Sequence, residues 1–463
     1  MEMTLEEISI ALKSVGDLNG LGNTMVKRVQ TDSRLVRPGD LFICLCGRRM
    51  DGHNFAGLAA KSGAAAVVSH HPMPDFKIPV LLVEDTLRGL GRLGRYWRMK
   101  KANMVIAVTG SAGKTTTKEM LSGVLGAGHL VGKNYKNWNN QIGLPLSILK
   151  FSGEEDFWIL ELGINCPADM DELGEIACPD QALILNIGPC HLQGLGTLEG
   201  VAKSKCKILD HLQGPKKAFV CRDYPLLEQE LGSRPHIKPV WFSCRGNPAG
   251  FNVEYLSSGH YQVREGEESI TLRSLPGAEQ YCENIGAVWA LARQSGMEPD
   301  QIIKGLDTVN LPEQRFSVGN LGSWTIIDDT YNANPLSMIR AVRSARNLAG
   351  QKNLYLVIGD MKELGDTEIR AHQDLGREIS KMDCRAVFFH GKNAGNVKTG
   401  LDGKVRNLFY EIRSPGHFKS ILDRLGCPEG VVLFKGSRSQ GMEKYVSCFR
   451  EWGSGNPDLE SER

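Results

Sequence analysis

Short apolar runs recur along the chain, and most of them alternate with stretches whose apolar residues have helical spacing. Runs of this length that are apolar at nearly every position are typical of buried strands. The pattern predicts strands at residues 65–69, 80–83, 105–108, 157–162, 182–187, 324–331, 354–360, 386–391 and 431–437. It predicts helices at residues 55–66, 118–125, 336–348 and 369–381. Strands that alternate with helices indicate parallel sheets with helices on both faces.

One loop between a predicted strand and a predicted helix has the residue types of a phosphate-binding loop. Residues 105–121 read VIAVTGSAGKTTTKEML, and Gly110 and Gly113 allow backbone N–H groups to approach an anion closely. Lys114 would bring a positive charge to the outer phosphates of a nucleotide, and Thr115 would offer a hydroxyl to Mg²⁺. The first glycine of the general pattern is missing. An ordinary strand-to-helix turn with a solvated lysine is the alternative.

The chain of 463 residues is too long for a single hydrophobic core, and the usual domain size predicts about three domains. We expect an α/β fold with a smaller N-terminal α/β domain at residues 1–100. A central parallel-sheet P-loop ATPase domain is expected at residues 101–312, and a C-terminal Rossmann-like domain at residues 313–463. The basic stretch at residues 95–103 is expected to be a linker, and the tail at residues 453–463 to be disordered.

Composition argues against several other classes of protein. Lys and Arg total 55 and Asp and Glu total 53, so no excess of basic charge favours nucleic acid or an anionic membrane. The acidic start of the chain does not resemble a signal peptide, and no apolar stretch approaches the length of a membrane span. The 12 cysteines show neither a zinc-site spacing nor a disulfide framework. We therefore expect a cytoplasmic, monomeric protein with reduced thiols.

Polar residues follow several of the predicted strands directly. In an open parallel sheet the ligand crevice lies beyond the carboxyl ends of the strands. The residues expected at this edge are Lys114, Thr115, Glu161, Asn186, His191, Asp328, Asp329, Asp360, Lys435 and Arg438. Carboxylates, an imidazole and hydroxyls around a phosphate loop suit Mg²⁺ and its waters. Taken singly, a carboxylate at a strand end is more often a helix cap or an ion-pair partner.

Eight motifs, in the same order, resemble those of the ATP-dependent Mur ligases of bacterial cell-wall synthesis. They are TDSRLVRPGDLF with GRRMDGHNF, then VTGSAGKTTTKEM, NWNNQIGLPLS, ELGINCP, NIGPCHLQGLGTLEGVAKSK, DDTYNANPLSM, GDMKELG and KGSRSQGME. The resemblance covers nearly the whole chain, and the phosphate loop of this family is itself shorter than the general pattern. It implies a ligase that uses ATP to add D-alanyl-D-alanine to UDP-N-acetylmuramoyl-tripeptide through an acyl phosphate, a cytoplasmic step of peptidoglycan synthesis.

The resemblance also implies which residues form each part of the site. ATP is expected to contact Gly110, Ser111, Ala112, Gly113, Lys114, Thr115, Thr116, Asn284, Arg315, Asp329 and Tyr331. Two magnesium ions are expected at Thr115, Glu161, His191 and, in carbamylated form, Lys205. The catalytic residues are then expected to be Lys114, Glu161, His191 and Lys205. The substrate contacts are expected to be Ser33, Arg34, Asn139, Asn140, Lys435 and Arg438.

Carbamylation of a lysine has a clear physical purpose in this family. Carbon dioxide turns a cation into an anionic carbamate with two oxygens that can bind magnesium. Lys205 aligns with the modified lysine, although Lys203, two residues away, is an alternative. The residues AKSKCK alone favour a different interpretation, a basic and solvated helix face.

The resemblance further implies separate roles for the domains. The N-terminal domain is expected to bind the UDP part of the substrate, and the C-terminal domain the incoming D-alanyl-D-alanine. We expect the last domain to swing onto the middle one when ATP and substrate bind, with hinges near Pro312 and Glu313. The third residue of the peptide, diaminopimelate or lysine, stays open.

Three alternative functions are weighed against this one. A folylpolyglutamate synthetase is disfavoured by TDSR with PGDLF and by DDTYNANP, and the ligase that adds the third amino acid is disfavoured by KGSRSQGME with YNANP. A P-loop regulator that binds a nucleotide without forming a bond is the alternative of a different class. A guanine-specific switch would carry an Asn-Lys-x-Asp stretch, and the sequence has none.

Overall fold

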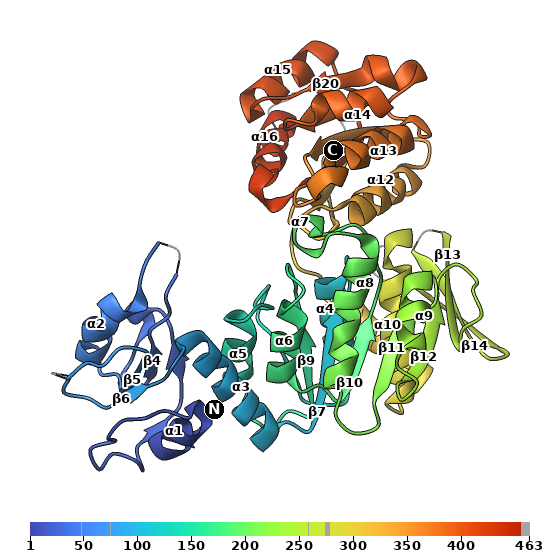
Figure 1. Ribbon diagram of the computed structural model, residues 1–463. Coiled ribbons are helices and arrows are strands. Elements are labelled where there is room, and N and C mark those ends of the chain that lie inside the picture. The colour runs from blue at the N-terminus through green and yellow to red at the C-terminus, as the bar shows by residue number, and fades with distance from the viewer. Residues whose placement is uncertain (48, 75, 258, 274–277, 455–463) are drawn as a thin grey trace.

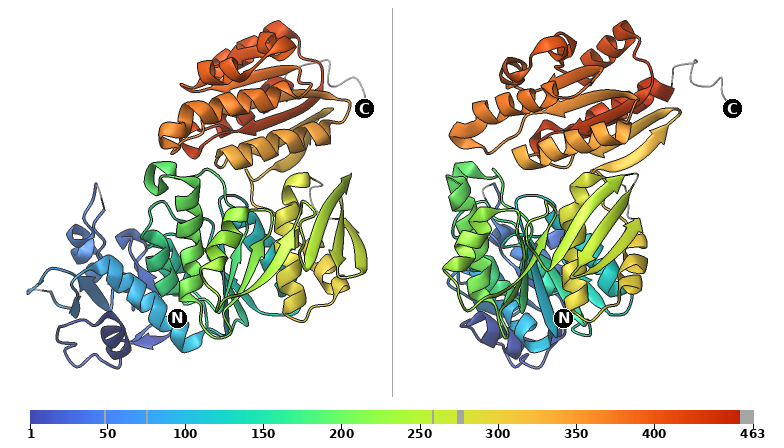
Figure 2. Two further views of the ribbon diagram at one scale, coloured as in Figure 1. Left: turned by 45° about the vertical axis from the view of Figure 1, so that its right-hand side comes forward. Right: turned by 90° about the vertical axis from the view of Figure 1, so that its right-hand side faces the viewer.

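Three α/β domains follow one another along the chain, as the sequence predicted (Figure 1). The computed structural model describes all residues except 48, 75, 258, 274–277 and 455–463. Figures 1 and 2 show the C-terminal domain on one side of the middle domain and the N-terminal domain on another, so that the middle domain contacts both. Within the described part of the chain, no helix is both long enough and apolar enough to cross a bilayer.

A parallel sheet of four strands, in the order β3-β4-β5-β6, forms the N-terminal domain. The strands of this domain are β1 (Met3–Thr4), β2 (Met25–Val26), β3 (Val29–Gln30), β4 (Leu41–Ile43), β5 (Ala66–Ser69) and β6 (Val80–Leu82). Its helices are α1 (Leu5–Leu12), η1 (Ser33–Leu35), η2 (Gly52–Phe55) and α2 (Ala56–Lys61). Strands β5 and β6 confirm two predicted strands. Helix α2 ends five residues before the predicted helix does, because the chain turns there to enter β5.

The expected linker at residues 95–103 is wrong, because most of it belongs to helix α3 (Thr86–Lys101). Asp85 caps the start of this helix by accepting hydrogen bonds from two backbone N–H groups of the first turn. Leu90 and Trp97 lie on its buried face, and the indole N–H of Trp97 donates to a backbone oxygen of the middle domain. The arginines and lysines between these apolar positions concealed the helical spacing in the sequence.

A sheet of nine strands forms the middle domain, in the order β15-β14-β13-β12-β11-β10-β7-β9-β8. The strands are β7 (Met104–Thr109), β8 (Val131–Lys133), β9 (Phe157–Glu161), β10 (Gln181–Ile184), β11 (Lys217–Cys221), β12 (Lys238–Ser243), β13 (Phe251–Ser257), β14 (His260–Glu265) and β15 (Glu268–Arg273). The helices are α4 (Lys114–Gly126), α5 (Gly143–Ile148), α6 (Asp169–Ala177), α7 (Leu192–Leu195), α8 (Leu198–Cys206), η3 (Lys207–His211), α9 (Pro225–Gly232), η4 (Glu279–Tyr281), α10 (Cys282–Gln294) and α11 (Pro299–Asp307).

The strands from β8 to β13 are parallel, as predicted, but β13, β14 and β15 form antiparallel pairs that the sequence did not predict. In β14, Tyr261 and Val263 are buried while their neighbours face outward. Such alternation is typical of an antiparallel strand with one solvated face. A search for fully apolar runs therefore missed this extension.

Six strands form the sheet of the C-terminal domain, in the order β16-β17-β21-β18-β19-β20, and only the edge strand β16 is antiparallel among these described strands. The strands are β16 (Ser317–Leu321), β17 (Trp324–Asp329), β18 (Asn353–Gly359), β19 (Ala386–His390), β20 (Phe409–Glu411) and β21 (Gly430–Lys435). The helices are α12 (Pro335–Ala349), η5 (Gly365–Thr367), α13 (Glu368–Ser380), α14 (Ala394–Gly400), η6 (Gly403–Leu408), α15 (Pro415–Leu425), η7 (Arg438–Gln440) and α16 (Glu443–Ser454).

The parallel strands of both large sheets are covered on two faces, as the sequence predicted. In β21, Val432 and Phe434 pack in the core that includes α15 and α16, while Val431 and Leu433 pack in the core on the opposite face. Helix α16 includes the first two residues of the tail at residues 453–463 that we expected to be disordered, and the remainder of that tail lies outside the described residues.

Candidate active site

A cavity of about 600 Å³ lies between the middle and C-terminal domains, a volume typical of small-molecule sites. Its walls are formed at the carboxyl ends of β7, β9 and β10 in one domain and of β17 and β21 in the other. The predicted site residues that line it are Ser111, Ala112, Gly113, Lys114, Thr115, Thr116, Asn139, Asn140, Glu161, His191, Asn284, Arg315, Asp329, Tyr331, Lys435 and Arg438. Of the residues predicted at the site or at this strand edge, all of which are described, those that do not line it are Gly110, Asn186, Lys205, Asp328, Asp360, Ser33 and Arg34.

The phosphate loop leads from β7 directly into α4, which begins at Lys114. Gly113 precedes the helix with a φ of 80°, and a Cβ atom at this position would lie 2.7 Å from the amide nitrogen of Asn284. Both observations require glycine here. The free N–H groups at the start of α4 therefore face the cavity with the favourable dipole of the helix, as in other anion sites.

Hydrogen bonds from side chains of the middle domain hold the phosphate loop in place. Asn186 accepts a hydrogen bond from the backbone N–H of Ala112 at 2.8 Å, and its amide group donates to the carbonyl of Ala112 at 3.1 Å. Asn284 donates to the carbonyl of Gly113 at 3.0 Å. The ammonium group of Lys114 donates to the carbonyl of Gly110 at 2.8 Å, which curls this side chain over its own loop. The loop is thus fixed in shape by the protein itself.

A cluster of oxygen atoms lies next to the loop. The hydroxyl of Thr115 donates to Oε2 of Glu161 at 2.9 Å, and the amide group of Asn139 donates to Oε1 of Glu161 at 2.7 Å. Glu161 is only 2% exposed, so its carboxylate is held by these partners and not by bulk water. A buried carboxylate beside a hydroxyl offers the oxygen ligands that Mg²⁺ prefers.

Lys118, which the sequence reasoning did not select, supports this cluster from inside the domain. Its side chain is fully buried, and its ammonium group donates to the carbonyls of Asn134 and Lys136 at 3.0 and 2.8 Å. The same nitrogen lies 3.8 Å from Oε2 of Glu161. The lysine therefore joins the segment before Asn139 to the carboxylate. Helical spacing within α4 was its only signal in the sequence.

His191 of the middle domain contacts the C-terminal domain next to the phosphate loop. Its Nδ1 lies 2.5 Å from Oε2 of Glu363 in the C-terminal domain, and both residues have left-handed backbone conformations, with φ values of 50° and 64°. Such conformations are costly for residues other than glycine and are common at functional sites. Burial lowers the pKa of His191 and the charge of Lys114 lowers it further, so the ring favours its neutral, metal-binding form.

The two lysines left open by the sequence have different surroundings on α8. Lys203 is exposed, whereas Lys205 is 1% exposed. Burial lowers the pKa of Lys205 to about 8, and the charge of Lys114 adds to this shift. The lowered pKa increases the fraction of neutral amine at Lys205.

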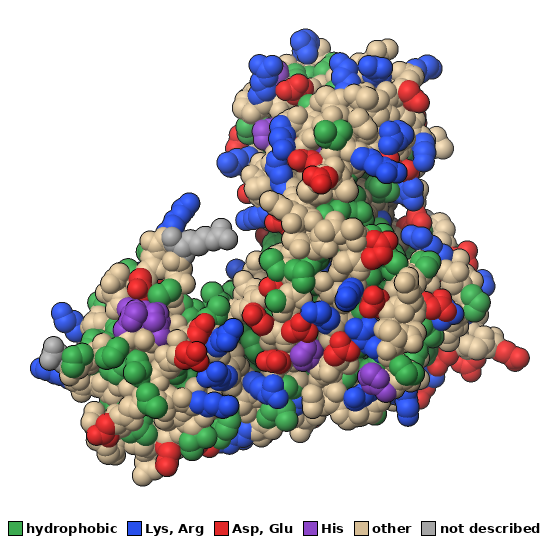
Figure 3. All heavy atoms as spheres, viewed as in Figure 1, with side chains coloured by type: hydrophobic (Ala, Val, Ile, Leu, Met, Phe, Trp, Pro, Cys, Tyr) green, Lys and Arg blue, Asp and Glu red, His purple; other side chains and the backbone are tan. Residues whose placement is uncertain are grey.

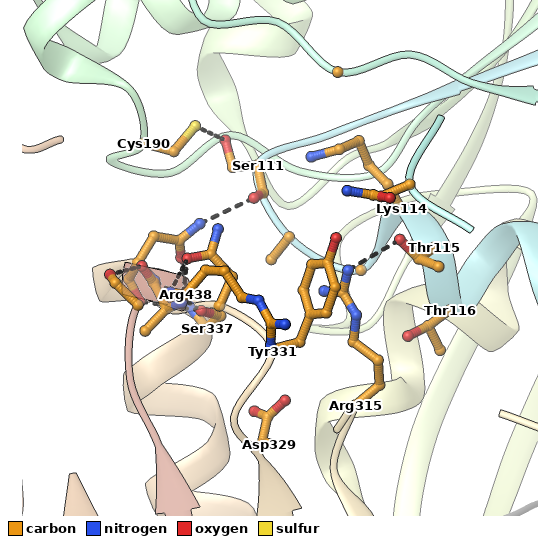
Figure 4. Close-up of a pocket in the computed structure, with 18 of the residues that line it drawn as sticks. Ser111, Lys114, Thr115, Thr116, Cys190, Arg315, Asp329, Tyr331, Ser337 and Arg438 are labelled. Atoms are coloured by element: carbon orange, nitrogen blue, oxygen red, sulfur yellow. Dashed lines mark hydrogen bonds between the residues drawn. The ribbon is translucent and has the colours of Figure 1, made fainter. Parts of the chain in front are cut away.

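The wall of the cavity formed by the C-terminal domain places a positively charged side chain, Arg315, next to the phosphate loop. Arg315 donates to the hydroxyl of Thr115 at 3.2 Å, and its guanidinium lies 3.7 Å from the centre of the Tyr331 ring (Figure 4). Below them, Lys435 donates to Asp329 at 2.6 Å, and burial raises the pKa of Asp329 despite this partner. The ammonium group of Lys435 is therefore held by Asp329 at the floor of the cavity.

Two other residues not selected from the sequence join the domains. Asn334, at the start of α12, donates to the carbonyl of Ser111 at 3.0 Å. Glu283 accepts from Asn186 at 2.7 Å and pairs with Arg340 across the domain boundary. Asn334 and Glu363 belong to the motifs DDTYNANPLSM and GDMKELG, so the motifs were found but these members were not singled out.

The remaining predicted substrate residues lie in three different places. Arg438 lies 3.2 Å from the side-chain oxygen of Gln314, at the mouth of the cavity. Ser33 and Arg34 lie in η1 of the N-terminal domain, where Arg34 pairs with Asp32 at 2.7 Å. Asn140 lines the cavity, and its Oδ1 accepts from the N–H of Gly143, the first residue of α5, at 2.8 Å.

Family models match three consecutive parts of the chain. They describe the catalytic domain of the Mur ligase family at residues 25–96, the Mur ligase middle domain at residues 108–292, and the Mur ligase glutamate ligase domain at residues 314–438. The UDP-N-acetylmuramoyl-tripeptide--D-alanyl-D-alanine ligase of Bacillus subtilis (strain 168) is 33% identical over 432 residues, which cover 91% of this chain and 93% of that protein.

Solved structures agree with these matches. A structure of MurF from Acinetobacter baumannii has a TM-score of 0.90 and 30% identity, and covers 97% of this chain and 99% of its own. The MurF ligase from Thermotoga maritima, in complex with ADP, has a TM-score of 0.83 and 29% identity, and covers 93% of this chain and 98% of its own. With sequence, fold and order of domains in agreement, the chain belongs to the Mur ligase family.

Proposed function

We propose that this protein is an ATP-dependent ligase that joins D-alanyl-D-alanine to UDP-N-acetylmuramoyl-tripeptide. The relatives that match nearly the whole chain carry that name. One structural observation carries the chemistry: the loop of Lys114, the oxygen cluster of Thr115 and Glu161, and Arg315 from the other domain converge on one cavity. These groups neutralise and position a phosphoryl group in transit, which is what such transfers need most.

The triphosphate of ATP is proposed to lie along the start of α4. Backbone N–H groups of residues 111–116 and the ammonium group of Lys114 would hold the outer phosphates. The Arg315–Tyr331 pair forms a flat, charged surface at the opposite wall, next to the buried Asp329. We propose that this wall contacts the ribose, the base and the transferred phosphate. Asn284 would support the loop while it lines the same cavity.

The oxygens of Thr115 and Glu161 fit a hard divalent cation, because they lie 2.9 Å apart and one belongs to a buried carboxylate. His191 and a carbamylated Lys205 are proposed to hold a second ion. Magnesium at these positions supplies positive charge that offsets the negative charge of the phosphates. The carboxylate of Glu161 would keep its orientation through Asn139 and Lys118.

Lys205 is the better candidate of the two lysines for carbamylation. Carbon dioxide reacts only with the neutral amine, forming a carbamate and releasing a proton, and the lowered pKa of Lys205 increases the neutral fraction. Its burial also protects the carbamate from water. Lys203 is solvent-exposed and has no such environment.

The proposed reaction has two steps. The terminal carboxylate of the tripeptide attacks the γ-phosphorus of ATP, a bond to the carboxyl oxygen forms, and the bond to the leaving ADP breaks. The amine of D-alanyl-D-alanine then attacks the carbonyl carbon, loses a proton, and expels inorganic phosphate to leave an amide. Lys114 and Arg315 would offset the charge on the phosphoryl oxygens in the first step. Water must be excluded, because it would hydrolyse the acyl phosphate.

The domain roles follow the same proposal. The N-terminal domain, with Ser33 and Arg34, would bind the UDP part of the substrate, and Asn139 and Asn140 would face its sugar and peptide. Arg438 and Lys435, at the C-terminal wall, would meet the incoming dipeptide. We propose that the protein acts as a monomer in the cytoplasm, where ATP and the UDP-linked precursor are supplied.

An omission assay tests the proposal. Phosphate release is measured with UDP-N-acetylmuramoyl-tripeptide, ATP and D-alanyl-D-alanine, and then with each one left out in turn. Turnover is expected only with all three present, with one phosphate released for each amide formed. Peptides with diaminopimelate or lysine as third residue are compared in parallel. Turnover with ATP alone, with folate and glutamate, or with a dipeptide substrate and the third amino acid would contradict the proposal.

A further inference from the structure

Three potential metal ligands come together in the N-terminal domain, whereas the cavity lies between the other two domains. The sulfur of Cys46, an imidazole nitrogen of His53 and an imidazole nitrogen of His70 all lie within 4.8 Å of one another. We propose that Cys46, His53 and His70 form a binding site for a divalent cation of the zinc class. Thiolate and imidazole ligands select such ions over magnesium or calcium.

The fold brings these residues together although they are far apart in the sequence. Strands β4 and β5 are parallel neighbours, and Cys46 follows the end of β4 while His70 follows the end of β5. His53 lies in η2, and its Nε2 accepts a hydrogen bond from the backbone N–H of His70 at 3.3 Å. The ligands thus share the carboxyl edge of one sheet. This explains why the cysteine spacing in the sequence gave no sign of a metal site.

A tight loop fixes the distance between Cys46 and His53. The backbone N–H of Gly52 donates to the carbonyl of Leu45 at 2.9 Å, and a Cβ atom on Gly52 would lie 2.7 Å from the nitrogen of Leu45. Only glycine permits this approach. The resulting separation between Sγ of Cys46 and Nδ1 of His53 is 3.8 Å. Ligands of a tetrahedral zinc ion lie roughly 3.5 Å apart, given Zn–S and Zn–N bonds of about 2.3 and 2.0 Å.

The charges around the site also favour a cation. Oδ1 of Asp51 lies 2.6 Å from Nδ1 of His53 and 3.3 Å from the sulfur of Cys46. For Nδ1 to bind the ion it would exchange this contact with Asp51 for the metal, and the carboxylate would then add negative charge beside the bound cation.

The site is open to solvent. Cys46 is exposed, and Figure 3 shows histidine side chains gathered on the surface of the N-terminal domain. His53 itself is held firmly, with a side chain only 7% exposed. An ion bound here would tie the loop after β4 to the end of β5. We expect it to raise the melting temperature of the full chain.

Cobalt(II), which replaces zinc and reports its ligands by absorption, tests the proposal in the full-length protein. One equivalent is expected to produce a thiolate-to-cobalt charge-transfer band, and zinc is expected to displace it. Cys46→Ser should remove the band, and His70→Ala should weaken zinc binding by at least about tenfold. The matched control is Cys190→Ser, because Cys190 is the thiol that adjoins His191 at the other candidate metal site.

The results distinguish a metal site at Cys46 from one at Cys190. A band that persists in Cys46→Ser and disappears in Cys190→Ser would overturn the proposal, as would a wild-type protein that gives no thiolate band. Melting temperatures with and without zinc give a second readout. Zinc should raise the value for the wild type and for Cys190→Ser, but not for Cys46→Ser.

Discussion

Lys114 and Lys118 are one helical turn apart on α4, and their surroundings are opposite. Lys114 lines the cavity, and its ammonium group donates to a carbonyl of its own loop, a partner that we propose it exchanges for a phosphate. Lys118 is fully buried and bonded to two carbonyls. The same residue type therefore lines the cavity at one position and supports the interior of the domain one turn later. Sequence motifs identified the first, because it lies beside glycines, but burial is a property of the folded chain.

Replacing Lys118 by methionine should reveal this support role. The variant keeps most of the side-chain volume but leaves the buried carbonyl of Asn134, the carbonyl of Lys136 and the nearby Glu161 without this cation. We expect the free energy of unfolding to fall by about 3–5 kcal/mol, as for other broken buried pairs. Denaturant titration measures this loss. Lys203→Met, at an exposed position of α8, is the control and should change stability little. Equal stability of the two variants would contradict the assignment.

Lys205 gives a second test at the residue scale. Lys205→Ala should lose most of the turnover, because no carbamate can form, and short carboxylic acids should restore part of it by supplying the missing oxygens. Lys203→Ala should keep its activity, since that side chain is exposed. Turnover and rescue are measured by phosphate release. Full activity of Lys205→Ala would show that the lysine is only a buried charge.

The pH dependence of the wild type follows from the same lysine. Burial lowers the pKa of Lys205 to about 8, so the ammonium form dominates below that pH and the neutral amine above it. The carbamylated fraction should therefore fall as the pH drops through about 8, and added bicarbonate should oppose the loss of rate. If added bicarbonate leaves the turnover rate unchanged both below and above pH 8, the result would argue against carbamylation.

At the scale of elements, fully apolar runs predicted several strands, because the parallel strands of the large sheets are covered on both faces. The buried runs of β4 and β11 were not singled out. The strands β7, β9 and β18 read as continuous apolar runs, and the phosphate loop was found from its place after β7. Elements with one solvated face were not predicted from apolar runs. Strand β14 alternates buried and exposed residues, and α3 carries its buried face among basic residues.

Gly113→Ala tests how far the phosphate loop depends on backbone geometry. The backbone φ of 80° and the 2.7 Å approach to Asn284 leave no room for a methyl group. The loop must shift, and the N–H groups at the start of α4 would no longer converge on one point. We expect ATP affinity to fall at least about tenfold while the melting temperature changes by only a few degrees. Nucleotide titration and thermal unfolding measure the two effects. An unchanged affinity for ATP would show that the loop does not hold the phosphates.

The control for this variant lies in the same helix. Gly126 has no heavy atom within 4 Å of an added Cβ atom, so Gly126→Ala should preserve ATP binding. Helix propensity should even favour that change slightly. A similar loss of affinity in both variants would mean that the effect is not specific to the loop.

At the scale of the whole molecule, the site exists only where two domains meet. Arg315 reaches Thr115, Glu363 reaches His191, and Asn334 reaches Ser111, each across the domain boundary. The sequence predicted the two halves, since residues after strands collect at one edge of each sheet. The strand pattern alone did not show which edges face each other, because that depends on packing between distant elements. The resemblance implied it, since it assigned ATP contacts to both domains.

Because the site is shared by two domains, we expect the C-terminal domain to close onto the middle domain when ligands bind. ATP and substrate would add contacts on both walls of the cavity, so the two domains should approach when both are bound. Fluorescent labels on α9 and α15 would report a shorter distance with both ligands than with ATP alone. Glu363→Gln, which removes the charge facing His191, should reduce this change. The same distance with and without both ligands would argue against closure.

The transfer of the terminal phosphate of ATP to a carboxyl group is the central claim, and an oxygen label tests it most directly. The tripeptide substrate is prepared with ¹⁸O in its terminal carboxylate, and the phosphate released during turnover is analysed by mass spectrometry. An acyl phosphate intermediate requires that each phosphate carry one labelled oxygen from the peptide. Phosphate without the label, released during amide formation, would contradict the account.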